Sequence, residues 1–124
     1  MRRPAATLGV IVFILFGPLV WAGYFLVIYG AHASLCAAGE RLPLLDASAL
    51  PLLLWGATAV ALSLLAAGAR WPGALGHLLR ALPEDDKTAR FVTRAMRLLT
   101  QLSLFGVGFA GIALTLVPLC AQLR

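Results

Sequence analysis

The two cysteines of this 124-residue chain have the clearest chemical meaning, because of where they lie. Cys36 falls near the end of the first long apolar stretch and Cys120 near the end of the last one. If both stretches cross a membrane in the same direction, both thiols reach the same face, and disulfides persist where that face is oxidising. The positions therefore predict a Cys36–Cys120 disulfide. The alternative is two free buried thiols that pack as small apolar side chains.

His32 lies one helical turn before Cys36, on a face that it shares with Trp21, Phe25 and Tyr29. A histidine inside a membrane segment is a functional candidate by default, and imidazole is a common ligand of haem and metal ions. A haem held by two histidines needs a second one at similar depth, but His77 lies in the connection on the other side of the bilayer. The favoured interpretation is a histidine bonded to a neighbour near the outer interface, with ligation as the alternative.

A stripe of polar side chains at helical spacing begins the last long helix. Its members are Lys87, Arg90, Arg94, Arg97 and Gln101. Asp86 stands four residues before Arg90, the favourable order for an acid–base pair on a helix. One interpretation is a contact with an acidic partner surface. The other, which we favour, is that these side chains extend to lipid phosphates at the inner interface, with Arg90, Arg94 and Arg97 as its main cations.

Other chemistry is poorly supported by the sequence. The long apolar stretches contain no Asp, Glu, Lys or Arg, which coupled ion transport usually needs near the membrane midplane. A self-associating channel would need polar stripes that these stretches lack. No nucleophile–base–acid set, phosphate loop or metal motif is present either. We therefore expect a non-catalytic protein with no catalytic residues, no metal site and no cofactor of its own.

The composition identifies the elements that must position these residues. Apolar residues make up 61% of the chain and charged residues only 12%, against about 45–50% and about 25% in soluble domains. Three windows are free of charge: residues 4–39, 47–69 and 98–123, of 36, 23 and 26 residues. Crossing the hydrocarbon core takes roughly 20 helical residues, so each window suffices for one crossing and none for two. The chain is expected to be an all-helical membrane protein with three spans.

These windows predict one integral membrane domain, residues 1–124, with helices at about 8–38, 47–69 and 84–121. Gly17-Pro18 should bend the first helix, since proline removes one backbone hydrogen bond. That first stretch is too long for a removable signal peptide. Asp46 or Ser48 is expected to cap the second helix. A short amphipathic segment at about 74–82 is expected to lie on the inner membrane surface.

The distribution of basic residues predicts the orientation. Eight Lys and Arg residues precede the first helix or follow the second, against only Arg41 and Arg124 on the other side. By the positive-inside rule the N-terminus is expected to be cytoplasmic and the C-terminus external, which is the periplasmic side if the membrane is a bacterial inner membrane. The net charge of +5 then reflects orientation rather than nucleic-acid binding.

Two stripes of small residues recur at helical spacing, one in each of the last two helices. They are Gly56, Ala59, Ser63 and Ala66, and Ser103, Gly106, Ala110 and Ala113. Small faces let membrane helices approach closely. We predict that the second and third helices pack through them. The alternative is that a sequence rich in Ala and Gly produces such stripes by chance.

The first third of the chain carries a resemblance. Gly17-Pro18-Leu19-Val20-Trp21, then Tyr24-Phe25, Tyr29 and Cys36, look like the opening of a family of small three-helix proteobacterial inner-membrane proteins encoded near haem–copper terminal oxidases. Many members have His where this chain has Tyr24. The resemblance implies an accessory subunit of a respiratory, electron-transport complex such as a cytochrome oxidase, with haem and copper in the partner subunits. Its alternative is a transient assembly or haem/copper-insertion factor. Expected partners are larger membrane subunits and lipids, not nucleic acid.

Overall fold

The computed structural model describes residues 4–38, 49–80 and 83–116, and every regular element in these ranges is a helix. In chain order they are α1 (Pro4–Ile14), α2 (Phe16–Ala38), α3 (Ala49–Arg70), α4 (Pro72–Leu78) and α5 (Asp86–Leu116). The helices α2, α3 and α5 are each long and apolar enough to cross a membrane. For the described residues, the predicted all-helical class is therefore confirmed, as is the presence of three helices long and apolar enough to span a membrane.

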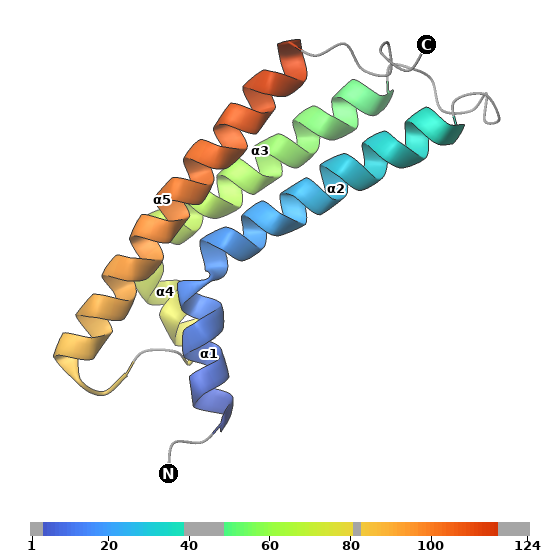
Figure 1. Ribbon diagram of the computed structural model, residues 1–124. Coiled ribbons are helices and arrows are strands. Elements are labelled where there is room, and N and C mark those ends of the chain that lie inside the picture. Colours follow the sequence, from blue (N-terminus) through green and yellow to red (C-terminus); the bar gives the residue numbers. More distant parts are fainter. Residues whose placement is uncertain (1–3, 39–48, 81–82, 117–124) are drawn as a thin grey trace.

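The three long helices form one bundle in which each packs against the other two (Figure 1). Helices α2 and α5 run in the same direction, and α3 returns beside both of them in the opposite one. The short helices α1 and α4 lie together at the end where α3 finishes and α5 begins. We call this the basic end, because every Lys and Arg of the described residues lies there, in the sequence from Arg70 to Arg97.

The first apolar stretch is two helices, not the single helix predicted for 8–38. Its break is at Leu15, between α1 and α2. Pro18 explains the position: it has no N–H to bond the carbonyl of Ile14, and its ring displaces that carbonyl. The N–H of Leu15 still bonds Ile11 at 2.9 Å, and the N–H of Leu19 bonds Leu15 at 2.8 Å. The chain therefore bends without uncoiling, and α1 turns away from the axis of α2 (Figure 1).

The second long helix, Ala49–Arg70, agrees closely with the predicted 47–69. The predicted capping residues Asp46 and Ser48 lie outside the described residues. Helix α4 is shorter than the predicted amphipathic segment at 74–82, because Arg80 has a left-handed φ of 49° and its N–H bonds the carbonyl of His77 at 3.2 Å. A residue in this conformation ends a helix.

Helix α5 begins at Asp86, two residues later than predicted, and the cap explains the difference. The hydroxyl of Thr88 donates to the Asp85 carboxylate at 2.8 Å, and the Ala89 N–H bonds the Asp85 carbonyl at 2.9 Å. Asp85 is thus the capping residue, and its charge lies at the positive end of the helix dipole. The predicted extension from 117 to 121 lies outside the described residues.

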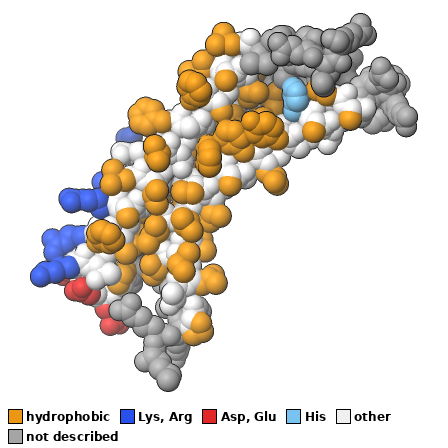
Figure 2. All heavy atoms as spheres, viewed as in Figure 1, with side chains coloured by type: hydrophobic (Ala, Val, Ile, Leu, Met, Phe, Trp, Pro, Cys, Tyr) orange, Lys and Arg blue, Asp and Glu red, His pale blue; other side chains and the backbone are white. Residues whose placement is uncertain are grey.

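Two buried clusters hold the helices together. The larger one, between α2, α3 and α5, consists of Tyr24, Ile28, Leu54, Ala61, Leu65 and Val107. The smaller one, at the basic end, consists of Phe13, Val92 and Met96, with Leu75 and Leu79 packed against it. The residues from α1 and α4 thereby attach both short helices to α5. Leu75 of α4 and Leu79 directly after it thus pack the predicted amphipathic segment against the bundle. Large apolar side chains cover much of the visible outer surface (Figure 2), as lipid contact requires.

Candidate functional site

A chain of hydrogen bonds joins α2 to α3 inside the larger cluster. The hydroxyl of Thr58 donates to the Leu54 carbonyl at 2.8 Å, and the hydroxyls of Thr58 and Tyr24 are 3.0 Å apart. Since the single proton of Thr58 is used toward Leu54, Tyr24 is the donor to Thr58. Gly111 of α5 completes the junction, because a Cβ there would lie 3.0 Å from Cγ2 of Thr58. All three spanning helices therefore meet at Thr58.

The backbones of α2 and α5 come very close at Gly17. A Cβ at Gly17 would lie 2.7 Å from Cα of Thr100, nearer than any real pair of such atoms. Thr100 is itself fully buried, and its hydroxyl donates to the Met96 carbonyl at 2.8 Å. Gly17 is therefore a contact point between helices as well as the neighbour of the bend.

The predicted packing between the two small-residue stripes is not formed. On α3, Gly56, Ala59, Ser63 and Ala66 are all exposed, and the space around a Cβ at Gly56 is empty to 4 Å. Helix α3 instead faces the bundle with Leu54, Thr58, Ala61, Leu65 and Gly68. These buried residues are larger on average, and they interlock with side chains of α2 and α5. We call the exposed stripe the small face of α3.

The stripe on α5 packs inward, but mainly toward α2. Ser103 is buried, with its hydroxyl donating to the Leu99 carbonyl at 2.9 Å. A Cβ at Gly106 would lie 3.0 Å from the indole nitrogen of Trp21, so this glycine makes room for the indole. The other two members, Ala110 and Ala113, are half-buried, and Ala110 packs on the larger cluster.

The aromatic side chains of α2 form a continuous row. Trp21 and Phe25 meet edge-on with ring centres 5.0 Å apart, and Phe25 and Tyr29 stack at 5.6 Å. This shared face agrees with the predicted spacing. His32, next on the same face, is half-buried and forms no hydrogen bond to any described residue. The predicted bond to a neighbour is therefore not observed within these ranges.

Cys36 is half-buried in the last turn of α2, at the end of the bundle opposite the basic end. It is disulfide-bonded. Its predicted partner, Cys120, lies outside the described residues, so the pairing of the two stays a prediction. Within the described residues, no group of three His, Cys, Asp or Glu side chains could hold a metal ion.

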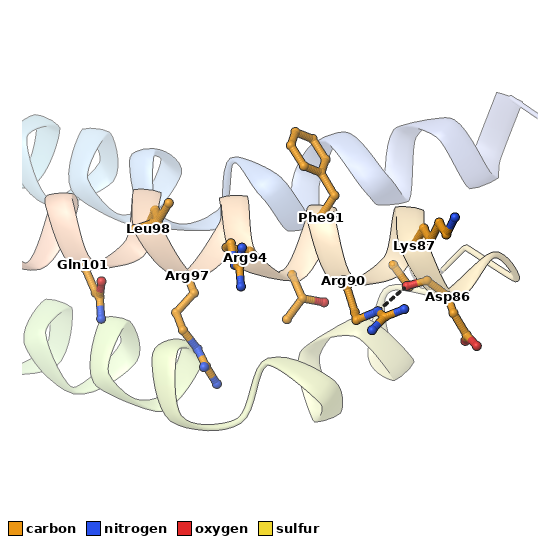
Figure 3. Close-up of a pocket in the computed structure, with 10 residues that line it drawn as sticks. Asp86, Lys87, Arg90, Phe91, Arg94, Arg97, Leu98 and Gln101 are labelled. Atoms are coloured by element: carbon orange, nitrogen blue, oxygen red, sulfur yellow. Dashed lines mark hydrogen bonds between the residues drawn. The ribbon is translucent and has the colours of Figure 1, made fainter.

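The predicted polar stripe forms the most distinctive polar surface among the described residues. We call it the basic face of α5: Lys87, Arg90, Arg94, Arg97 and Gln101, all exposed. Together with neighbours on the same helix, they line an open hollow along α5 (Figure 3), to which no other described helix contributes a residue. The Nε of Arg90 donates to the backbone carbonyl of Asp86 at 3.2 Å, so the expected Asp86–Arg90 contact uses the backbone. Figure 3 shows Arg97 extended toward α3.

No family model, curated protein or solved structure matched this chain in comparisons with each. Its function is therefore argued from its own residues. The basic face lies on one stripe of α5, as its spacing in the sequence predicts. The Tyr24–Thr58 bond was not predicted, although polar side chains within a span signal a need for partners. Gly17 was predicted only as part of a bend, and its contact with Thr100 was not.

Proposed function

We propose that this protein is a non-catalytic accessory subunit that lies against a larger complex in a bacterial inner membrane. The observation that carries the proposal is the small face of α3. It is exposed over four positions from Gly56 to Ala66, about 15 Å of helix, and the bundle does not use it. In lipid, helices associate by packing, and small residues allow their backbones to come close.

The chemistry of this face suits another apolar helix. The hydroxyl of Ser63, its one polar side chain, donates to the Ala59 carbonyl at 2.7 Å. The face therefore presents no unpaired donor to hydrocarbon. Large exposed residues such as Leu52 and Trp55 flank it on α3 and can pack around an incoming helix.

The leading partner is a haem–copper cytochrome oxidase of the respiratory chain. This choice rests on the resemblance of the first helix, and it puts haem and copper in the partner subunits. The proposed orientation has the basic end in the cytoplasm. Outside the three long helices, the described residues form only the short helices α1 and α4 and the turn before α5, so the surfaces that they offer a partner are mainly packing surfaces.

The test is co-purification of the tagged chain from native membranes in mild detergent. Wild-type protein should be recovered with the active oxidase in fixed stoichiometry. Ala59→Leu should reduce that recovery at least about tenfold, since a leucine separates helices that pack through small residues. The matched control is Ala22→Leu, which adds the same bulk at an exposed position of α2 and should have no effect.

Three outcomes would contradict the proposal. Recovery with immature, cofactor-free oxidase alone would favour the assembly or haem/copper-insertion role. Equal loss in both variants would show that the small face is not the contact. A mature oxidase that lacks the chain, with no other membrane complex recovered, would refute the subunit role.

A further inference from the structure

The cations of the basic face lack acidic partners. Within the described residues, no carboxylate forms an ion pair with Arg94 or Arg97, and Arg90 bonds only a backbone carbonyl. The acids nearest to these cations in the sequence do not pair with them. Asp85 accepts the hydrogen bond from Thr88, and Asp86 lies two helical turns before Arg94. The four cations of the basic face can therefore bind an anion from outside the bundle.

The position of these cations along α5 indicates where that anion lies. The uncharged part of the helix from Leu98 to Leu116 is about 28 Å long, close to the roughly 30 Å of the hydrocarbon core. Arg97 and Arg94 then lie at the level of the lipid headgroups, and Arg90 and Lys87 lie beyond them. The headgroup phosphates of phospholipids are the anions that surround the protein at this level.

The hollow also has an apolar component. Phe91 and Leu98 line it beside the arginines and are 72% and 61% exposed. An acidic soluble protein could reach the cations but would gain nothing from Leu98, which faces hydrocarbon. A phospholipid satisfies both parts, with its phosphate on the arginines and the start of an acyl chain along Leu98. Guanidinium groups suit phosphate well, because they can donate two parallel hydrogen bonds.

We propose that the basic face of α5 is a selective site for an anionic phospholipid, with Arg94 and Arg97 holding the phosphate and Leu98 contacting the acyl chain. A zwitterionic lipid carries the same phosphate but also a quaternary ammonium group, which the four cations of the basic face repel, so the site should prefer a lipid of net negative charge. This inference is independent of the accessory-subunit proposal, since it concerns another helix and another kind of ligand.

The test is binding of phosphatidylglycerol and phosphatidylcholine to the full, detergent-solubilised chain, counted by native mass spectrometry. Wild-type protein should retain more phosphatidylglycerol than phosphatidylcholine. The double variant Arg94→Gln/Arg97→Gln should weaken phosphatidylglycerol binding about 10- to 30-fold and leave phosphatidylcholine unchanged. The matched control, Arg70→Gln/Arg80→Gln, removes the same charge from exposed positions outside the hollow and should bind as wild type.

Circular dichroism of both double variants shows whether the bundle is intact, and Arg94→Lys/Arg97→Lys provides a second measure. The lysine variant keeps the charge but loses bidentate bonding. Its affinity for phosphatidylglycerol should therefore fall between those of the Arg94→Gln/Arg97→Gln variant and the control pair. Equal weakening in the control pair would mean that net charge alone attracts the lipid. Equal retention of the two lipids by wild type, or displacement by millimolar inorganic phosphate, would also overturn the proposal. The proposal would also be overturned if Arg94 and Arg97 were required to bind an acidic protein but not to bind lipid.

Discussion

At the scale of single residues, the buried polar side chains of the spanning helices find their partners within the bundle. No buried side-chain nitrogen or oxygen of the described residues lacks a hydrogen-bond partner. Thr58, Thr100 and Ser103 each donate to the carbonyl four residues earlier. Hydrocarbon supplies no replacement bonds, so these local bonds are what permits such residues inside a membrane. Between the described residues, the Tyr24–Thr58 bond is the only side-chain hydrogen bond that joins two helices.

Replacing Tyr24 with phenylalanine should therefore lower the stability of the bundle. The change removes the interhelical bond but leaves Thr58 bonded to Leu54, so no group becomes unpaired. We expect a loss of about 0.5–1.5 kcal/mol. Unfolding by sodium dodecyl sulfate in mixed micelles, followed by circular dichroism, measures it.

Tyr29→Phe is the control, because Tyr29 lies on the same helix and is 66% exposed, against 5% for Tyr24. It should unfold as wild type does. Equal destabilisation of the two variants would show that the buried hydroxyl contributes nothing specific.

At the scale of helices, the contact between α2 and α5 depends on the missing side chain at Gly17. Adding a methyl group brings it against the backbone of Thr100, which cannot turn aside as a flexible side chain could. Pro18 adds a second constraint, because it determines where α1 bends away. One dipeptide thus sets both the spacing of two spans and the direction of the N-terminal helix.

Gly17→Ala should force α2 and α5 apart and destabilise the protein by about 1–3 kcal/mol, as overpacking does. Thermal unfolding in detergent, followed by circular dichroism, should show the lower midpoint. Gly23→Ala provides the comparison, since a Cβ at Gly23 meets nothing within 4 Å on the same helix. A midpoint for Gly17→Ala no lower than that of Gly23→Ala would contradict the close approach.

At the scale of the whole molecule, the bundle is electrically asymmetric. The described Lys and Arg residues all lie toward the basic end (Figure 2 shows several of them), which should therefore face the cytoplasm. A Glu84→Cys variant, with the native cysteines changed to serine, tests this orientation. A membrane-impermeant maleimide should label it only after the cells are opened. Labelling in intact cells would reverse the predicted topology.

The predicted orientation would place Cys36 at the oxidising face, where the predicted bridge to Cys120 would form. We expect no alkylatable thiol in the purified protein before reduction and two after it, measured by intact mass. A bridge closing so long a loop should contribute about 2–4 kcal/mol, observable as a lower unfolding midpoint after reduction. Two thiols that react without reduction would refute the pairing.

The sequence alone determined the number of spans, because the length of an uncharged window can be compared directly with the thickness of a bilayer. It also located the bend near Pro18 and the basic face of α5, since both follow from residue type and local helical spacing. The inner and outer faces of α3 could only be decided by the tertiary structure. In water, polarity separates buried from exposed faces, but in lipid both are apolar, so Gly56, Ala59 and Ser63 look equally suited to either. The Tyr24–Thr58 bond likewise depends on the rotation and relative depth of two helices, which local spacing does not specify.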